Sequence, residues 1–249
     1  MKKLLYIVFM ALCTAPGALM AQERQVENRP YTDLRPFHFG IFVGTHMQDM
    51  ELENVGLQTL TAEDGTTQEA LITADQDRWD AGLNVGVSGE LRLNTYFQLR
   101  VAPSLYFGTR HLTFTNLAET EADGTPIKRH QNLKTVYIGA PVELIFASKR
   151  LNNTRPYLMA GINPMLNLNT KSDDYLKLKR YDVYAEVGVG CDFYLPFFKL
   201  RPELKFLYSL INALDTAHPA RLKDPMMVPY AGSVSKARTK MIVLSFYFE

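Results

Sequence analysis

The histidines are the side chains whose spacing most directly tests for catalysis or metal binding. His38 and His46 are eight residues apart on one face of a predicted strand, too far apart to share a metal ion. His111, His130 and His218 fall in predicted loops. The chain has no His-Glu-x-x-His pair, no Gly-x-Ser-x-Gly elbow and no phosphate-binding glycine loop. We therefore expect no catalytic residues, metal, cofactor or small-molecule substrate; the alternative is a hydrolase that uses a loop histidine.

A second group of chemically active residues alternates with apolar ones. The segment YDVYAEVGVGCDFYLP, residues 181–196, has apolar residues at odd positions, and its even positions carry acids, glycines and tyrosines. This period-two pattern predicts a β-strand with two opposite faces. Similar polar faces elsewhere carry charges, and the full set is Glu90, Arg100, Glu143, Glu186, Arg201, Glu203 and Lys205.

These charges have two interpretations if the polar faces point into a closed barrel. Buried ions must pair, because an isolated one costs several kcal/mol, so a plug of salt bridges that fixes the strand register is one reading. A proton or ion path is the other, but it needs a water-filled lumen. Eight strands enclose only enough space for their own side chains. We therefore expect a structural charge network in a solid barrel.

The elements that would position these residues are eight alternating segments. They span residues 37–48, 80–92, 97–108, 135–147, 157–168, 181–196, 198–208 and 240–248. Connections after the second, fourth and sixth segments are short, whereas those after the first, third, fifth and seventh are long and polar. Outer-membrane barrels have this asymmetry, with short turns in the periplasm. The alternative is a soluble β-barrel or sandwich, whose apolar faces would pack together.

We therefore predict an all-β fold, an eight-stranded antiparallel transmembrane β-barrel of outer-membrane type, over residues 37–249. The closing sequence MIVLSFYFE alternates in the same way, with Phe248 next to last. Lys2 and Lys3 precede an apolar run that ends in a small-residue cleavage site, so residues 1–21 are a predicted signal peptide. Residues 22–36, with Pro30 and Pro36, are predicted to be an extended periplasmic lead-in.

Composition excludes several other classes. Removing the two signal-peptide lysines changes the formal charge from +1 to −1, which gives no electrostatic basis for binding nucleic acid. Only Cys191 would remain, so no disulfide framework is expected. Four prolines interrupt the predicted strands, where they mark either bulges or places of weak lateral pairing. They are Pro103, Pro141, Pro164 and Pro202.

The first long connection, residues 49–79, is strongly acidic. The third and fourth lean basic, for example at Lys236 and Arg238. Two readings stay open: a docking face for a partner protein, or solvated acids paired with their own basic neighbours. The acidic residues are Asp49, Glu51, Glu53, Glu63, Asp64, Glu69, Asp75 and Asp77.

Several segments resemble the outer-membrane barrel component of the type IX (Por) secretion system of Bacteroidota. They are LRPFHFGIFVG, LNTYFQLRVAPSLYFGTR, IGAPVELIF, RPYLMAGINP and KARTKMIVLSFYF. The resemblance implies an outer-membrane location and a role in exporting cargo that carries a C-terminal sorting domain. It also implies partners among the other secretion proteins of the outer membrane and periplasm. It implies no catalytic residues, and a generic adhesion or structural barrel is the alternative.

Overall fold

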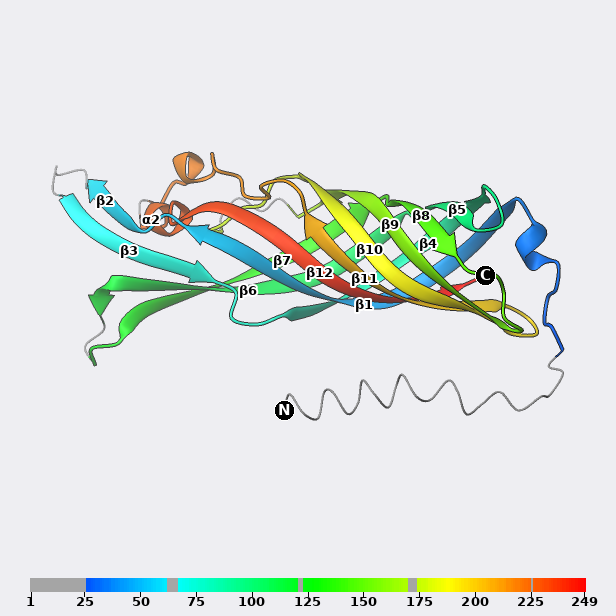
Figure 1. Ribbon diagram of the computed structural model, residues 1–249. Coiled ribbons are helices and arrows are strands. Elements are labelled where there is room, and N and C mark those ends of the chain that lie inside the picture. The colour runs from blue at the N-terminus through cyan, green and yellow to red at the C-terminus, as the bar shows by residue number, and fades with distance from the viewer. Residues whose placement is uncertain (1–25, 62–66, 121–122, 170–173, 225) are drawn as a thin grey trace.

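The computed structural model describes residues 26–61, 67–120, 123–169, 174–224 and 226–249. The predicted signal peptide lies outside these residues. Twelve strands are assigned within the described part of the chain, and they dominate it (Figure 1). They are β1 (Phe37–Asn54), β2 (Leu57–Thr61), β3 (Thr67–Asp75), β4 (Asp80–Arg92), β5 (Phe97–Val101), β6 (Ser104–Thr120), β7 (Pro126–Gly139), β8 (Val142–Ala147), β9 (Thr154–Asn167), β10 (Tyr181–Tyr194), β11 (Lys199–Ser209) and β12 (Val234–Phe248).

These strands close into a ring of eight. Antiparallel pairing runs from β9 through β10, β11, β12 and β1 to β4. The next barrel strand consists of β5 followed by β6, and the eighth consists of β7 followed by β8. Both parts of this eighth strand pair with β9, which closes the ring. The prediction of an eight-stranded antiparallel barrel is therefore confirmed.

Pro103 and Pro141 mark the two places where one barrel strand is divided into two. Gly89 pairs with Val101 and Gly86 with Ser104, so the pairing advances three residues on both strands across Pro103. No residue is inserted, and the first reading of this proline, a bulge, is wrong. Proline lacks an N–H, so each one removes a ladder donor, while its carbonyl still accepts. The carbonyls of Pro103, Pro141 and Pro164 accept from the amides of Val87, Ala102 and Ala140.

The apolar face of the barrel points outward. Val187 is 55% exposed and Phe39 is 76% exposed, whereas Glu186 and Arg100 on the opposite face are at most 1% exposed. A water-soluble sandwich would bury these apolar side chains against each other. An exterior band of exposed aliphatic and aromatic side chains instead matches a surface that faces lipid.

The strands continue beyond this band, and there their pattern inverts. On β6 the outward residues change from Phe107 to Thr109, and the inward residues change from Tyr106 to Leu112 and Phe114, which are buried. β1 changes in the same way, since outward Met47 is followed by charged residues on that face. We call the part of the molecule beyond this change the extracellular end, because the long connections lie there.

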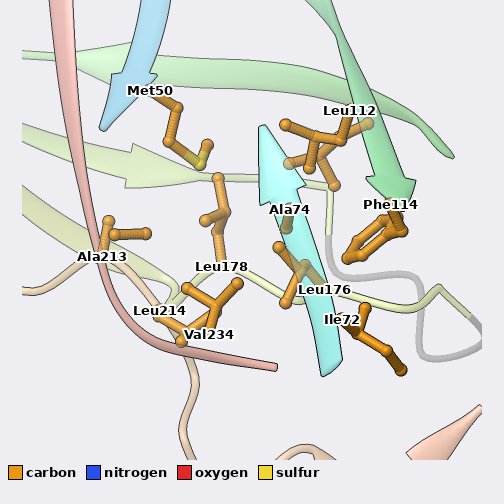
Figure 2. Packing of buried hydrophobic residues seen from close by; sticks show 12 residues of the cluster. Met50, Ile72, Ala74, Leu112, Phe114, Leu176, Leu178, Ala213, Leu214 and Val234 are labelled. Atoms are coloured by element: carbon orange, nitrogen blue, oxygen red, sulfur yellow. The ribbon is translucent and has the colours of Figure 1, made fainter. Parts of the chain in front are cut away.

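The extracellular end has its own hydrophobic core, which is the largest in the described chain (Figure 2). Its side chains come from strands far apart in sequence and from the segments that join β9 to β10 and β11 to β12. The core comprises Met50, Ile72, Ala74, Leu112, Phe114, Leu133, Leu176, Leu178, Ala213, Leu214, Val234 and Ala237. The hairpins β2–β3 and β6–β7 project from this end (Figure 1).

The predicted extent of the long loops is therefore wrong. Most of residues 49–79 and 109–134 form strands rather than loops. Their alternation is real, but its apolar residues face a protein core instead of lipid, so their polarity resembles that of a loop exposed to water. Three short helices complete the described structure, Thr32–Leu34, Pro219–Arg221 and α2 (Val228–Ala231). None of the described helices has the length and apolar character to cross a membrane.

The predicted lead-in contacts the opposite, periplasmic end instead of extending away from it. The Asn28 amide donates to Asn153 Oδ1 at 2.9 Å, and Tyr194 donates its hydroxyl to Asp33 at 2.7 Å. The Arg150 guanidinium lies 3.8 Å from the centre of the Tyr194 ring and donates to the carbonyls of Asn28 and Arg29. Residues 28–33 thus lie across the turn between β8 and β9.

Candidate functional site: the lumen and the extracellular end

Arg100 is the centre of the charge network in the lumen. It is on β5, and the alternation of that strand directs it inward, where it is fully buried. Its guanidinium donates to Glu143 on β8 and, at 2.5 Å, to Glu203 on β11. Glu90 on β4 lies 3.6 Å away. One arginine thus joins four barrel strands, and this arrangement fixes how those strands face each other.

Two further cations extend the network. Lys205 Nζ lies 2.9 Å from Glu143 and 3.2 Å from Glu203. Arg201 pairs with Glu90 and lies 2.6 Å from Asp192. Large side chains such as Tyr106, Tyr184 and Tyr247 are also buried in the lumen. The geometry favours a plug over an ion path, because ion-paired side chains occupy the lumen at this level.

The periplasmic end of the network includes residues that the sequence analysis did not assign to it. The Glu249 carboxylate pairs with Lys199 at 2.5 Å and with His38, and it lies 3.6 Å from Arg201. Asp192 also belongs to the network. Their sequence signal was present, because Asp192 and Lys199 share the inward face of their strands with Glu186 and Arg201.

Glu186 differs from the other six predicted network residues. It is 1% exposed, yet no cation of the described chain lies within salt-bridge distance of its carboxylate. Asn163 Nδ2 donates a long hydrogen bond of 3.5 Å to the Glu186 carboxylate. The alternation placed Glu186 on the correct face, but a face does not determine which side chains meet across a barrel.

The described acidic residues of the first long connection separate into two groups. Asp49, Glu51 and Glu53 on β1 lie opposite Lys240, Arg238 and Lys236 on β12, respectively. Lys240 Nζ lies 3.0 Å from both Asp49 and Glu51. The hydrogen bond from Lys240 lowers the pKa of the exposed Glu51 carboxyl below its usual value.

The second group lies on and after β3. Glu69, Asp75 and Asp77 are exposed, and Asp77 accepts a 2.8 Å hydrogen bond from Thr113. Glu63 and Asp64 lie outside the described residues. The strand register, which sequence alone does not give, thus places the first group opposite a row of cations, whereas Glu69 and Asp75 lie opposite threonines.

The histidines are dispersed. His38 pairs with Glu249, His46 is buried against the Tyr106 ring, and His218 Nε2 donates to the carbonyl of Asp174 at 2.7 Å. His111 contacts Asp80, and His130 lies 3.1 Å from Thr113. In the described residues, no three His, Cys, Asp or Glu side chains are placed to hold one metal ion. Cys191 is a free thiol.

A closed ring of strands with an apolar exterior band and a charged interior defines an outer-membrane β-barrel. The family comparison agrees: residues 20–215 match the outer membrane protein beta-barrel domain, and the chain belongs to that family. The protein is located in the outer membrane. The match ends before β12, which completes the ring between β11 and β1.

Solved structures with a similar fold include three outer-membrane proteins. OprG from Pseudomonas aeruginosa has a TM-score of 0.42 at 14% identity, with 84% of this chain and 93% of that chain covered. The neisserial surface protein NspA gives 0.40 at 12%, covering 86% and 98%. Ail, the attachment invasion locus protein of Yersinia pestis, was solved with the heparin analogue sucrose octasulfate and gives 0.36 at 13%, covering 86% and 99%. No curated protein sequence matches the chain significantly.

Proposed function

We propose that this protein is a PorT-type component of the type IX (Por) secretion system, a non-catalytic outer-membrane barrel needed to export cargo with C-terminal sorting domains, such as proteases and adhesins. The proposal starts from the sequence segments that resemble that component. Two of them map onto the barrel as follows: residues 34–44 lead into β1 and form its first part, and residues 236–248 lie in β12.

The observation that carries the proposal is the filled lumen. Arg100, Glu143 and Glu203 form buried ion pairs across the barrel interior, where a folded cargo protein would have to pass. An eight-stranded barrel has no room for such cargo beside its own side chains. The protein would therefore act as an accessory, through surfaces at its two ends and its lipid-facing wall, together with other secretion proteins of the outer membrane and periplasm.

Two surfaces are the candidates for those contacts. At the extracellular end, Glu69, Asp75 and Asp77 are exposed on and after β3, whereas Asp49 and Glu51 are already paired with Lys240. We propose Glu69, Asp75 and Asp77, with Glu63 and Asp64 of the same connection, as the acidic docking face. At the periplasmic end, residues 28–33 form a surface fixed to the barrel, which a periplasmic partner could contact.

Deletion of the gene tests this function. Sorting-domain cargo should accumulate in the periplasm, and its surface delivery should return when the wild-type gene is restored. Affinity purification from mild detergent should recover outer-membrane and periplasmic secretion proteins. Normal cargo secretion in the deletion strain would contradict the proposal.

A generic adhesion or structural barrel is the second candidate. The folded extracellular end favours it, because a packed core supports two projecting hairpins and gives them a defined shape. In that case the deletion strain would secrete normally, and replacing the exposed residues 117–120 at the end of β6 would abolish attachment to a surface or receptor.

A further inference from the structure

The outer rim of the barrel has a gap in strand pairing beside β6. The pairing of β4 with β6 ends at Gly82 and Gly108, and the pairing of β3 with β6 begins at Asp75 and Thr113. Residues 109–112 of β6 therefore have no strand neighbour on that side. Instead of a carbonyl from a neighbouring strand, the Asp80 carboxylate accepts a 2.8 Å hydrogen bond from the His111 amide.

A hollow of about 510 Å³ lies at this gap. Its apolar floor comprises Ala81, Phe107 and Val136. The polar residues Thr109, His111 and Lys134 line it on the side toward the extracellular end. Phe107 pairs with Val136 in the register, and Thr109 pairs with Lys134 one step farther out. The hollow, called the rim niche below, thus crosses the boundary at which the exterior changes from apolar to polar.

The charges of the rim niche favour an anion over a cation. The Asp80 carboxylate is buried and engaged: it accepts from the His111 ring at 2.7 Å and from Gln76 at 3.2 Å, and Arg78 lies 3.3 Å away. Lys134 is exposed, and its ammonium has no ion-pair partner among the described residues. The His111 ring uses Nδ1 on Asp80, so Nε2 is the nitrogen left for a ligand.

We propose that the rim niche binds the phosphate-bearing headgroup of an outer-leaflet lipid. Lys134 contacts the phosphate as a charge-assisted donor, with the Thr109 hydroxyl and His111 Nε2 beside it. An acyl chain of the same lipid lies over Phe107 and Val136, which belong to the lipid-facing band of the barrel exterior. An amphiphile is the fitting occupant, because the niche is polar on the side toward the extracellular end and apolar on the side toward the membrane. This inference does not depend on the secretion role.

The test is native mass spectrometry of the purified protein in detergent, titrated with lipid A and with the same lipid stripped of its phosphates. Lys134→Gln should weaken lipid A binding about tenfold. The matched control is Lys128→Gln, which changes an exposed lysine on the same face of β7 outside the niche and should leave binding unchanged. Heat-modifiability on gels establishes that both variants are folded.

Three results would overturn the proposal. The first is equal affinity of the wild type and Lys134→Gln for lipid A. The second is equal binding of the phosphate-free lipid, which would show that only the apolar floor matters. The third is that millimolar inorganic phosphate displaces lipid A and forms phosphate adducts that depend on Lys134. That result would identify a free-anion site instead of a lipid site.

Discussion

The barrel interior and the extracellular end have opposite kinds of core, although the same strands build both. Within the membrane, β5, β8 and β11 direct Arg100, Glu143 and Glu203 inward and their apolar residues outward. Beyond the membrane, β6 directs Leu112 and Phe114 inward and its polar residues outward. The polarity of a strand face therefore follows its surroundings and not its position relative to the barrel axis.

The physical cause is the change of solvent along each strand. Acyl chains solvate apolar side chains and cannot solvate ions, so the charges collect inside and pair. Water reverses this preference, and apolar side chains are then driven into a core. The two cores differ in directionality as well: the ion pairs depend on geometry, whereas the apolar contacts depend mainly on volume.

The largest expected effect is in the ionic core. Arg100→Met leaves Glu143 and Glu203 buried with one cation fewer, and removing one partner from a buried pair costs about 3–5 kcal/mol. We expect a lower guanidinium midpoint and a lower gel-shift temperature for the purified barrel. Adding Glu143→Gln should recover part of the loss, and an unchanged midpoint in the single variant would refute a structural role for the network.

The second prediction sharpens the boundary between the two regions. Val187→Arg places a charge against lipid and should cost about 2–4 kcal/mol, so that less barrel is inserted. Thr115→Arg makes the same change on the outward face of β6 beyond the boundary, where water solvates it, and should have little effect. Assembly can be measured by the fraction of heat-modifiable protein in outer membranes; equal defects would contradict the proposed boundary.

The third prediction concerns the apolar core. Leu112 is 1% exposed, and Leu112→Ala should cost about 2–5 kcal/mol through lost burial and a residual cavity. This loss should be confined to the extracellular end, because the ion pairs of the barrel are not touched. Limited proteolysis should cleave the β6–β7 hairpin sooner while the barrel keeps its gel shift; loss of the whole barrel would show that the two cores fold as one unit.

The sequence alone was sufficient for the faces of the barrel strands. Strict alternation placed Glu90, Arg201 and Lys205 inside and Val187 outside, and the segregation of short and long connections identified the barrel class. It was not sufficient for the extracellular end, because a strand with polar residues outward and short apolar residues inward resembles a solvated loop. It also did not show that Glu186 lies outside the ion pairs or that Lys240 neutralises Asp49 and Glu51.

The sequence by itself determined which face of each strand is apolar, and with it the membrane location, because period-two patterning depends only on local backbone geometry. The tertiary structure decided which charges pair, where the strands leave the membrane, and that Asp80 replaces a missing strand beside His111. These features depend on register between distant segments. A shift of two residues would preserve every face and yet exchange every partner, which is why composition and spacing cannot specify them.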